Sequence, residues 1–183
     1  MKVLLASASP RRKELLNEVF CDFKVETYPA NEDFLGDTPQ ATVKEIAFRK
    51  LDAVPQKERF DVIISSDTLV YKDGKYYGKP KDRNQALEML LELEGRTHVV
   101  CSGVALYVNG NVEVFAESTL VTFNSMSREQ IEGYLDNHYC LDKAGAYAIQ
   151  DGVVVKEIIG SYSNVVGLPV EKLKEILKEK KIV

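Results

Sequence analysis

The stretch Ser7–Lys13 combines two serines with three consecutive cations, Arg11, Arg12 and Lys13. Ser9-Pro10 is a typical helix start, with serine as the N-cap and proline in the first turn. The N-terminus of a helix already carries about half a positive charge and free N–H donors, so three further cations there make sense if an anion is bound. Helix N-termini and arginine side chains both bind phosphate. The stretch indicates an anion site, with a solvated basic turn as the alternative.

A second candidate is Asp67, a carboxylate inside the apolar stretch Val62–Val70. A carboxylate in an apolar strand is costly unless it is paired or binds a metal. Asp73-Gly74 predicts a two-residue hairpin turn, which places Thr68 opposite Lys79 and Asp67 on the adjacent diagonal. We therefore expect an acid, a hydroxyl and an ammonium to converge. The alternative is a structural Asp–Lys ion pair at the end of a sheet.

Weaker signals come from the loop acids Glu32 and Asp33 and from the segment Asp142–Gln150. Together with Asp67, the two loop acids could hold a divalent cation, because hard cations prefer carboxylate oxygens. Taken alone, they are ordinary loop acids. Gln150 can present both a donor and an acceptor to the edge of a base, and the small residues before it allow close approach. A solvated surface glutamine is the alternative.

Composition limits the class of protein. The chain has 183 residues, 45% hydrophobic and 28% charged, as expected for one globular domain. Its net charge of −4 argues against a general nucleic-acid binder. No apolar run approaches the roughly 18 residues that span a bilayer, and the apolar run after Lys2 is too short for a signal peptide, so we expect a cytoplasmic protein with no membrane partner.

The three cysteines are widely spaced, so we expect them to be buried free thiols. The chain has only two histidines and no GxSxG motif, which argues against catalysis by a Ser-His-Asp or Cys-His arrangement.

The elements that hold these residues alternate between strand and helix patterns, which indicates an α/β fold. Two tight-turn signals, at Asp73-Gly74 and Asn109-Gly110, make the sheet mixed rather than parallel. The expected strands are Lys2–Ala6, Phe23–Tyr28, Asp61–Tyr71, Lys75–Gly78, Thr97–Val108, Asn111–Phe123, Tyr147–Gln150 and Val153–Ile159. The expected helices begin at Ser9-Pro10, Thr38-Pro39, Asp82, Ser127 and Pro169.

Seven segments together resemble the Maf family of nucleoside triphosphate pyrophosphatases, and they occur in the family's order. These segments are Leu5–Arg12, Ala47–Lys50, Ser66–Thr68, Gly78–Pro80, Gly95–His98, Asp142–Tyr147 and Val166–Pro169. The resemblance covers essentially the whole chain, so we expect a single domain over residues 1–183.

The resemblance implies an elongated mixed β-sheet flanked by helices, with two lobes and a nucleotide cleft between them. It implies hydrolysis of a nucleoside triphosphate to monophosphate and pyrophosphate by water attack on the α-phosphorus, assisted by Mg²⁺ or Mn²⁺, in a homodimer. The stretch Tyr147–Gln150 is similar to the branch that acts on dTTP and UTP, and modified pyrimidine nucleotides are also candidates. The alternatives are hydrolysis of 7-methyl-GTP and a nucleotide-sensing regulator of septum formation.

The resemblance also assigns roles by motif position. Asp67 matches the family's catalytic acid, as proton acceptor or metal ligand. The positions that match phosphate contacts are Ser7, Arg12, Lys50 and Lys79. The positions that match base choice are Arg11, Thr68 and Gln150. The chain departs from the usual pattern at Ser66, Ala148 and Asp151, where the family has smaller residues, and in the order of the loop acids Glu32-Asp33.

Overall fold

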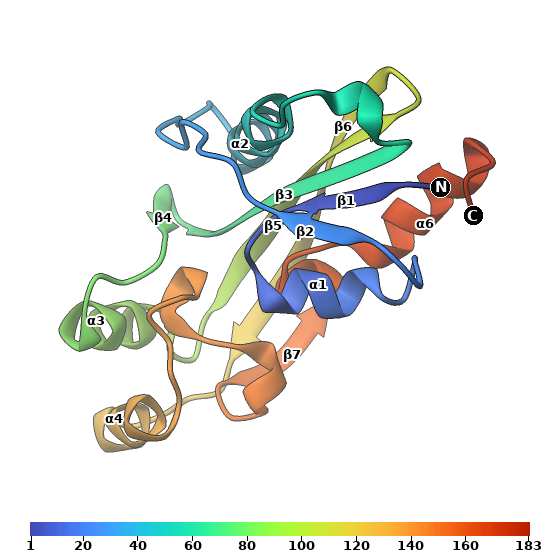
Figure 1. Cartoon of the computed structure of the whole chain (residues 1–183). Coiled ribbons are helices and arrows are strands. Elements are labelled where there is room, and N and C mark those ends of the chain that lie inside the picture. The colour runs from blue at the N-terminus through green and yellow to red at the C-terminus, as the bar shows by residue number, and fades with distance from the viewer.

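Apolar, β-branched runs joined by tight turns form the centre of a mixed sheet in the computed structural model, which describes residues 1–183 (Figure 1). The turns Asp73-Gly74 and Asn109-Gly110 have positive φ at all four residues (48°, 82°, 47° and 91°), as type I′ hairpins require. The strands are β1 (Val3–Ala6), β2 (Lys24–Glu26), β3 (Val62–Lys72), β4 (Lys75–Tyr77), β5 (Thr97–Val108), β6 (Asn111–Phe123) and β7 (Val155–Ile159).

The sheet has the order β2-β1-β3-β5-β6-β7, with β4 also paired to β3. β1 runs parallel to β2 and β3, and the other pairs are antiparallel. On one edge, β3 pairs with β5 from Val62 to Tyr71. On its other edge, β3 pairs with β1 only at Val62–Ile64 and with β4 only at Val70–Lys72. The stretch Ser65–Leu69, which contains Asp67, therefore has no neighbouring strand on that edge.

Six α-helices flank the sheet, and polar N-caps start most of them. They are α1 (Pro10–Leu16), α2 (Pro39–Asp52), α3 (Arg83–Leu93), α4 (Arg128–Asn137), α5 (Tyr162–Val166) and α6 (Val170–Glu179). Ser9, Thr38 and Asp82 each accept a backbone N–H from the first turn, and Ser127 forms a capping box with Gln130. The predicted helix starts are confirmed. No helix is long and apolar enough to cross a membrane.

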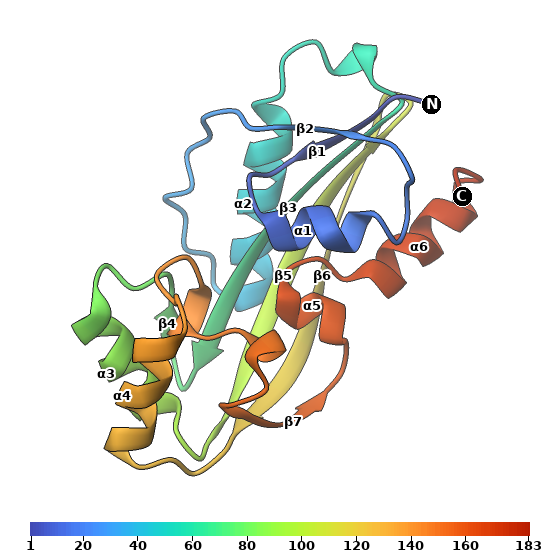
Figure 2. The same cartoon turned by 60° about the horizontal axis from the view of Figure 1, so that its bottom comes forward.

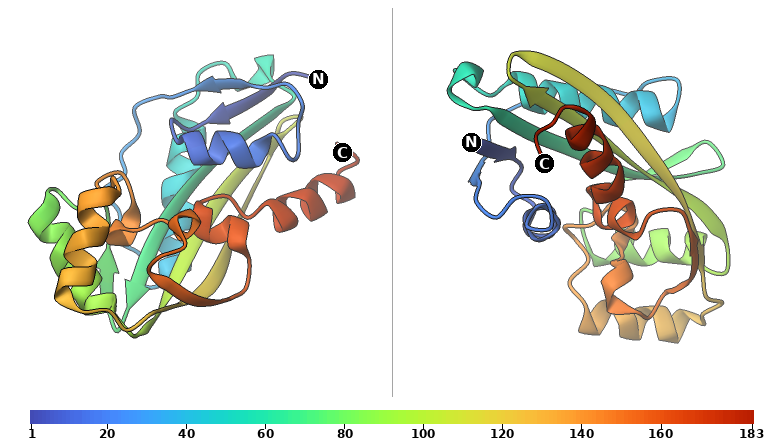
Figure 3. Two further views of the ribbon diagram at one scale, coloured as in Figure 1. Left: turned by 90° about the horizontal axis from the view of Figure 1, so that it is seen from below. Right: turned by 90° about the vertical axis from the view of Figure 1, so that its right-hand side faces the viewer.

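The helices cover both faces of the sheet. α2 packs on one face, and α1, α5 and α6 lie on the other (Figures 2 and 3). α3 and α4 lie side by side near β4 at one end of the molecule (Figure 1). Their apolar faces close a core cluster with the segment that contains Tyr147. The expected mixed sheet flanked by helices is confirmed.

The register of the β3–β4 hairpin is as predicted, but the hairpin is shorter than predicted. Lys72 pairs with Lys75 and Val70 with Tyr77, and β4 ends there. The prediction that Thr68 lies opposite Lys79 is wrong, because the chain leaves the sheet before Lys79. Thr68 has Ser102 of β5 as its partner.

The predicted strand at Tyr147–Gln150 is also wrong. This part of the chain instead holds one 3₁₀ turn before Tyr147, Ala144–Ala146, and a second, Ile149–Asp151, that includes Gln150. Gly145 and Ala146 have φ of 72° and 62°, which breaks an extended chain. Ala146 and Tyr147 are buried because they pack under α3 and α4, and no neighbouring strand pairs with this segment.

Two smaller features were not predicted. The five-residue helix α5 begins at the N-cap Ser161 and is too short to show a helical period in the sequence. Cys101 and Cys140 are buried free thiols as predicted, whereas Cys21 is exposed.

His98 on β5 is buried in an aromatic cluster that supports Tyr147. Its Nε2 lies 2.8 Å from the Tyr147 hydroxyl, and its ring packs edge-on against Phe123 at 4.8 Å between centroids. Burial, with a smaller effect of Lys72, lowers the pKa of His98 to about 4 from an ordinary value of 6.5. Native His98 is therefore neutral, while the unfolded chain takes up a proton below about pH 6.5.

We expect the native state to lose about 2 kcal/mol of stability through His98 between about pH 7 and pH 5, because the unfolded state binds the extra proton in that window. Urea unfolding at the two pH values measures this loss. His98→Gln should remove it, since glutamine does not titrate, and His138→Gln should retain it. An equal pH dependence in His98→Gln and the wild type would contradict the assignment.

Candidate active site

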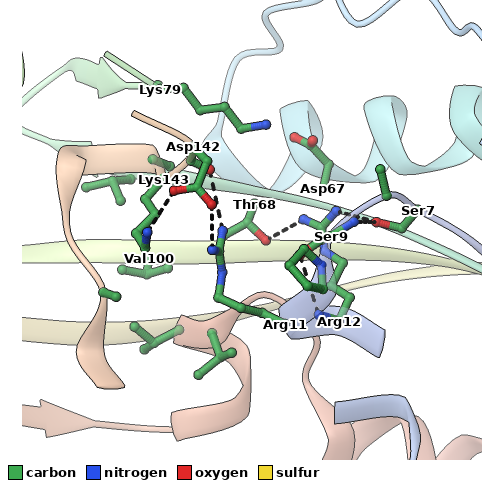
Figure 4. A pocket seen from close by; sticks show the side chains of 18 of the residues that line it. Ser7, Ser9, Arg11, Arg12, Asp67, Thr68, Lys79, Val100, Asp142 and Lys143 are labelled. Carbon is green, nitrogen blue, oxygen red and sulfur yellow. Dashed lines mark hydrogen bonds and ion pairs between the residues drawn. The ribbon is translucent and has the colours of Figure 1, made fainter. Parts of the chain in front are cut away.

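A cavity of about 660 Å³ opens over the unpaired edge of β3. Its walls come from the end of β1, α1, the Glu32 loop, the end of α2, the chain after β4, the segment 142–150 and α5. Figure 4 shows charged side chains from several of these elements pointing into it. Because side chains alternate along a strand, Asp67 and Thr68 lie on opposite faces of the sheet, and the cavity curves around the edge between them.

On the face covered by α2, Asp67 meets Lys50. The Lys50 ammonium lies 2.7 Å from Asp67 Oδ1 and 2.9 Å from Glu32 Oε2. The Lys50 and Asp67 side chains are only 17% and 16% exposed, so their attraction is screened less than that of a surface pair. The ammonium that meets Asp67 thus belongs to Lys50, and the pairing with Lys79 expected from the sequence is wrong.

The helix α2 approaches β5 closely above this pair because Gly103 has no side chain. A Cβ at Gly103 would lie 2.3 Å from the Val43 carbonyl oxygen of α2. Gly103 is the β5 partner of Asp67, and Lys50 follows Val43 by two helical turns. The close approach of helix and sheet therefore sets the distance between the ammonium and the carboxylate.

On the opposite face, Arg12 of α1 is held by three acceptors. Its Nη1 donates to Ser7 Oγ at 3.2 Å, its Nη2 to Thr68 Oγ1 at 3.0 Å, and its Nε to the Gly167 carbonyl at 2.9 Å. Burial lowers the pKa of Arg12, and Asp67 opposes that shift. Arginine stays charged under these conditions, so Arg12 presents a fixed cation beside the carboxylate. These contacts bring Ser7, Arg12 and Thr68 together at one wall of the cavity.

Arg11 reaches across the cavity to the segment 142–150. Its Nη1 lies 2.9 Å from Asp142 Oδ2, and Lys143 lies 2.7 Å from Asp142 Oδ1. Although burial opposes ionisation, the hydrogen bonds from Lys143 and Arg11 keep the pKa of Asp142 below its ordinary value. Lys79 is exposed and points across the cavity toward Asp67 without an ion pair, unlike the other lysines of the lining (Figure 4).

The remaining predicted residues are distributed unevenly. Gln150 is exposed on the rim of the cavity and Glu32 lines it, whereas Asp33 is exposed on the same loop and does not. No group of three or more His, Cys, Asp or Glu side chains forms a metal cluster. Two carboxylates are nevertheless enough for Mg²⁺, which is usually held by one or two carboxylates together with substrate phosphates. Asp67 and Glu32 fit that donor set.

Sequence reasoning missed the ion pair between Asp142 and Arg11 of α1. The ion pair between Arg11 and Asp142 joins residues 131 positions apart, so no local pattern predicts it. The one sequence feature that could have indicated this contact is the pair of opposite charges at Asp142 and Lys143, two residues before Gly145. The role of Gly167, whose carbonyl accepts hydrogen bonds from Arg12 and from Ser66 Oγ, was also missed.

The fold has a relative among solved structures. The structure of the Ham1 protein of Staphylococcus aureus superposes with a TM-score of 0.56 and covers 98% of this chain and 100% of that chain. The two sequences are 17% identical, so this likeness concerns the fold alone.

Sequence comparison then identifies the family. The pattern of the family described as "Maf-like protein" matches residues 2–180, so this chain belongs to the Maf family. It is 41% identical to a protein of Caldanaerobacter subterraneus subsp. tengcongensis over 97% of this chain and 88% of the relative. It is 42% identical to a protein of Symbiobacterium thermophilum over 97% and 93%, and 39% identical to one of Clostridioides difficile over 98% and 95%. All three relatives carry the name dTTP/UTP pyrophosphatase.

Proposed function

We propose that this protein hydrolyses dTTP and UTP to the monophosphate and pyrophosphate. The observation that carries the proposal is the Asp67 carboxylate at the unpaired edge of β3, with the cations Lys50 and Arg12 on either side of it. Membership of the Maf family and the names of relatives at about 40% identity support the same reaction.

The substrate lies in the cavity, which we assign as a cleft between two lobes of one domain, residues 1–183. One wall comes from α1 and the Glu32 loop, and the other from the segment 142–150. The triphosphate carries several negative charges and is held by Arg12, Lys50 and Lys79, with the Ser7 hydroxyl beside Arg12. Lys79 is available for this contact because it forms no ion pair in the free protein.

The chemistry follows from Asp67. When the phosphates pair with Lys50, the carboxylate is released to accept a proton from a water molecule. That water attacks the α-phosphorus, the bond from the α-phosphorus to the bridging oxygen breaks, and pyrophosphate leaves with the electron pair. A divalent cation held by Asp67 and Glu32, with Asp33 as a further predicted ligand, would neutralise phosphate charge and polarise the phosphoryl group. Fixed cations around the phosphates supply most of the rate enhancement.

The base end of the substrate lies toward Arg11, Thr68 and Gln150. The Gln150 amide offers one donor and one acceptor, which match the alternating groups on the edge of uracil or thymine. Thr68 influences the base indirectly, by holding the Arg12 guanidinium in place, because its hydroxyl is hydrogen-bonded to Arg12 and to Ser102. The homodimer that the resemblance implies stays a prediction.

The test is pyrophosphate release from a panel of nucleotides with Mg²⁺ or Mn²⁺: dTTP, UTP, CTP, dCTP, their 5-methyl forms, GTP and 7-methyl-GTP. We expect turnover of dTTP and UTP. A preference for 7-methyl-GTP would keep the reaction and reject the assigned base. Tight binding without pyrophosphate release from any nucleotide would favour a nucleotide-sensing protein instead.

A further inference from the structure

One hydroxyl group connects the rim of the cavity to the helix behind it. The Tyr134 side chain on α4 is 3% exposed, and its hydroxyl donates to Asp151 Oδ2 at 2.5 Å. The same oxygen accepts the backbone N–H of Ala148 at 3.2 Å. Tyr134 therefore contacts the first and the last residue of the turn Ala148–Asp151.

This turn carries Gln150. Its own backbone closes it, because Asp151 N–H donates to the Ala148 carbonyl at 3.3 Å and Gly152 N–H to the Ile149 carbonyl at 3.2 Å. Gln150 is exposed, and its side chain forms no hydrogen bond within the protein. Its direction therefore depends on the turn, and the Tyr134 hydroxyl bonds the turn at both ends.

Tyr134 itself is held rigidly. Its ring stacks on the His138 ring with 4.5 Å between centroids and an interplanar angle of 22°, and the ring lies in the core cluster beneath α3 and α4. Burial, and the hydrogen bond to Asp151, raise the pKa of the Tyr134 hydroxyl, so it keeps its proton and remains a donor to the carboxylate. The turn is thus tied to a side chain that does not reach the cavity lining.

We propose that Tyr134 and Asp151 are positioning residues for base selection, which hold Gln150 on the cavity rim without touching the nucleotide. This rests on the proposed function. A fixed amide can discriminate between uracil and cytosine, because uracil presents an acceptor at position 4 where cytosine presents a donor. If the turn moves, the Gln150 amide no longer meets the base at a fixed position, so loss of the Tyr134–Asp151 contact should relax base selection more than it slows the reaction.

The first test is Tyr134→Phe, which removes the hydroxyl and keeps the ring. We expect the ratio of kcat/KM for UTP to that for CTP to fall about tenfold, mainly through KM, with kcat for UTP nearly retained. Tyr77→Phe is the matched control. It also removes a buried hydroxyl bonded to a carboxylate, that of Glu92 at 2.9 Å, but Tyr77 forms no hydrogen bond with the turn Ala148–Asp151. Its ratio should equal that of the wild type.

A second pair of variants keeps the proposal testable if Tyr134→Phe fails to fold. Asp151→Ala should reproduce the relaxed ratio, and Asp151→Asn should restore most of the selectivity because the amide oxygen still accepts from Tyr134. Unchanged selectivity in Tyr134→Phe and Asp151→Ala would overturn the proposal, as would an equal loss of kcat for both nucleotides. A wild type that shows no preference for UTP over CTP would overturn it too. A wild type that releases no pyrophosphate at all would instead reject the proposed function.

Discussion

Asp67→Asn should lower kcat/KM for pyrophosphate release by about 10²–10⁴-fold, the range that a positioned proton acceptor contributes. Asparagine keeps the size of the side chain and its hydrogen bond to Lys50, but it cannot accept a proton from water. The fold should survive, because Lys50 keeps its second partner, Glu32, at 2.9 Å. The measurement is steady-state pyrophosphate release from dTTP and UTP, together with a thermal unfolding curve of the variant.

Asp73→Asn is the matched control for this substitution. Asp73 lies in the exposed β3–β4 turn a few residues from Asp67, where its carboxylate pairs only with Lys72. Asparagine is well suited to its positive φ of 48°. Activity should therefore stay at the wild-type level. Near-normal turnover by folded Asp67→Asn would reject the assigned role of the carboxylate.

Gly103→Ala should destabilise the protein by about 3 kcal/mol, the upper end of the usual range for an overpacked core. The new Cβ would lie 2.3 Å from the Val43 carbonyl oxygen and 2.8 Å from the Lys44 nitrogen, and both atoms belong to the backbone of α2. A helix backbone cannot rotate away as a flexible side chain can, so α2 has to move off the sheet. That movement carries Lys50 away from Asp67, and activity should fall even in the fraction that folds.

Gly133→Ala in α4 serves as the control, because nothing lies within 4 Å of a Cβ at that position. Alanine in a helix should stabilise the protein by about 0.4–1 kcal/mol. The measurements are urea unfolding and pyrophosphate release on both variants: Gly103→Ala should lose stability and activity, and Gly133→Ala should lose neither. If Gly103→Ala unfolds at the wild-type urea concentration, the close approach of α2 does not determine the position of Lys50.

The sequence predicted helix caps and turns well, because these depend on residues that are close together in the chain. The caps at Ser9, Thr38 and Ser127 and the hairpin register Lys72–Lys75 all depend on residues within a few positions of each other. The turn type follows from Asp73-Gly74 for the same reason. What the turn could not predict is how far the pairing continues, and it ends at Tyr77.

The site could be predicted as a set of residues but not as a set of contacts. Asp67, which the sequence singles out, does line the cavity, yet the ammonium beside it belongs to Lys50, because the crossing of α2 over the sheet decides that pair. A short apolar run predicted a strand at Tyr147–Gln150, although such a run also suits a segment that packs under two helices. Contacts between distant parts of the chain, such as Arg11 with Asp142, have no local signal.

The unpaired stretch of β3 also limits what can bind there. An exposed strand edge normally invites a second chain to add a strand through backbone hydrogen bonds. Here β1 and β4 occupy the same edge on either side of Ser65–Leu69, so an arriving peptide would collide with one of them after a few residues. The opening is about 16 Å long at roughly 3.3 Å per residue. The molecule therefore admits a compact solute at this edge and excludes an extended polypeptide.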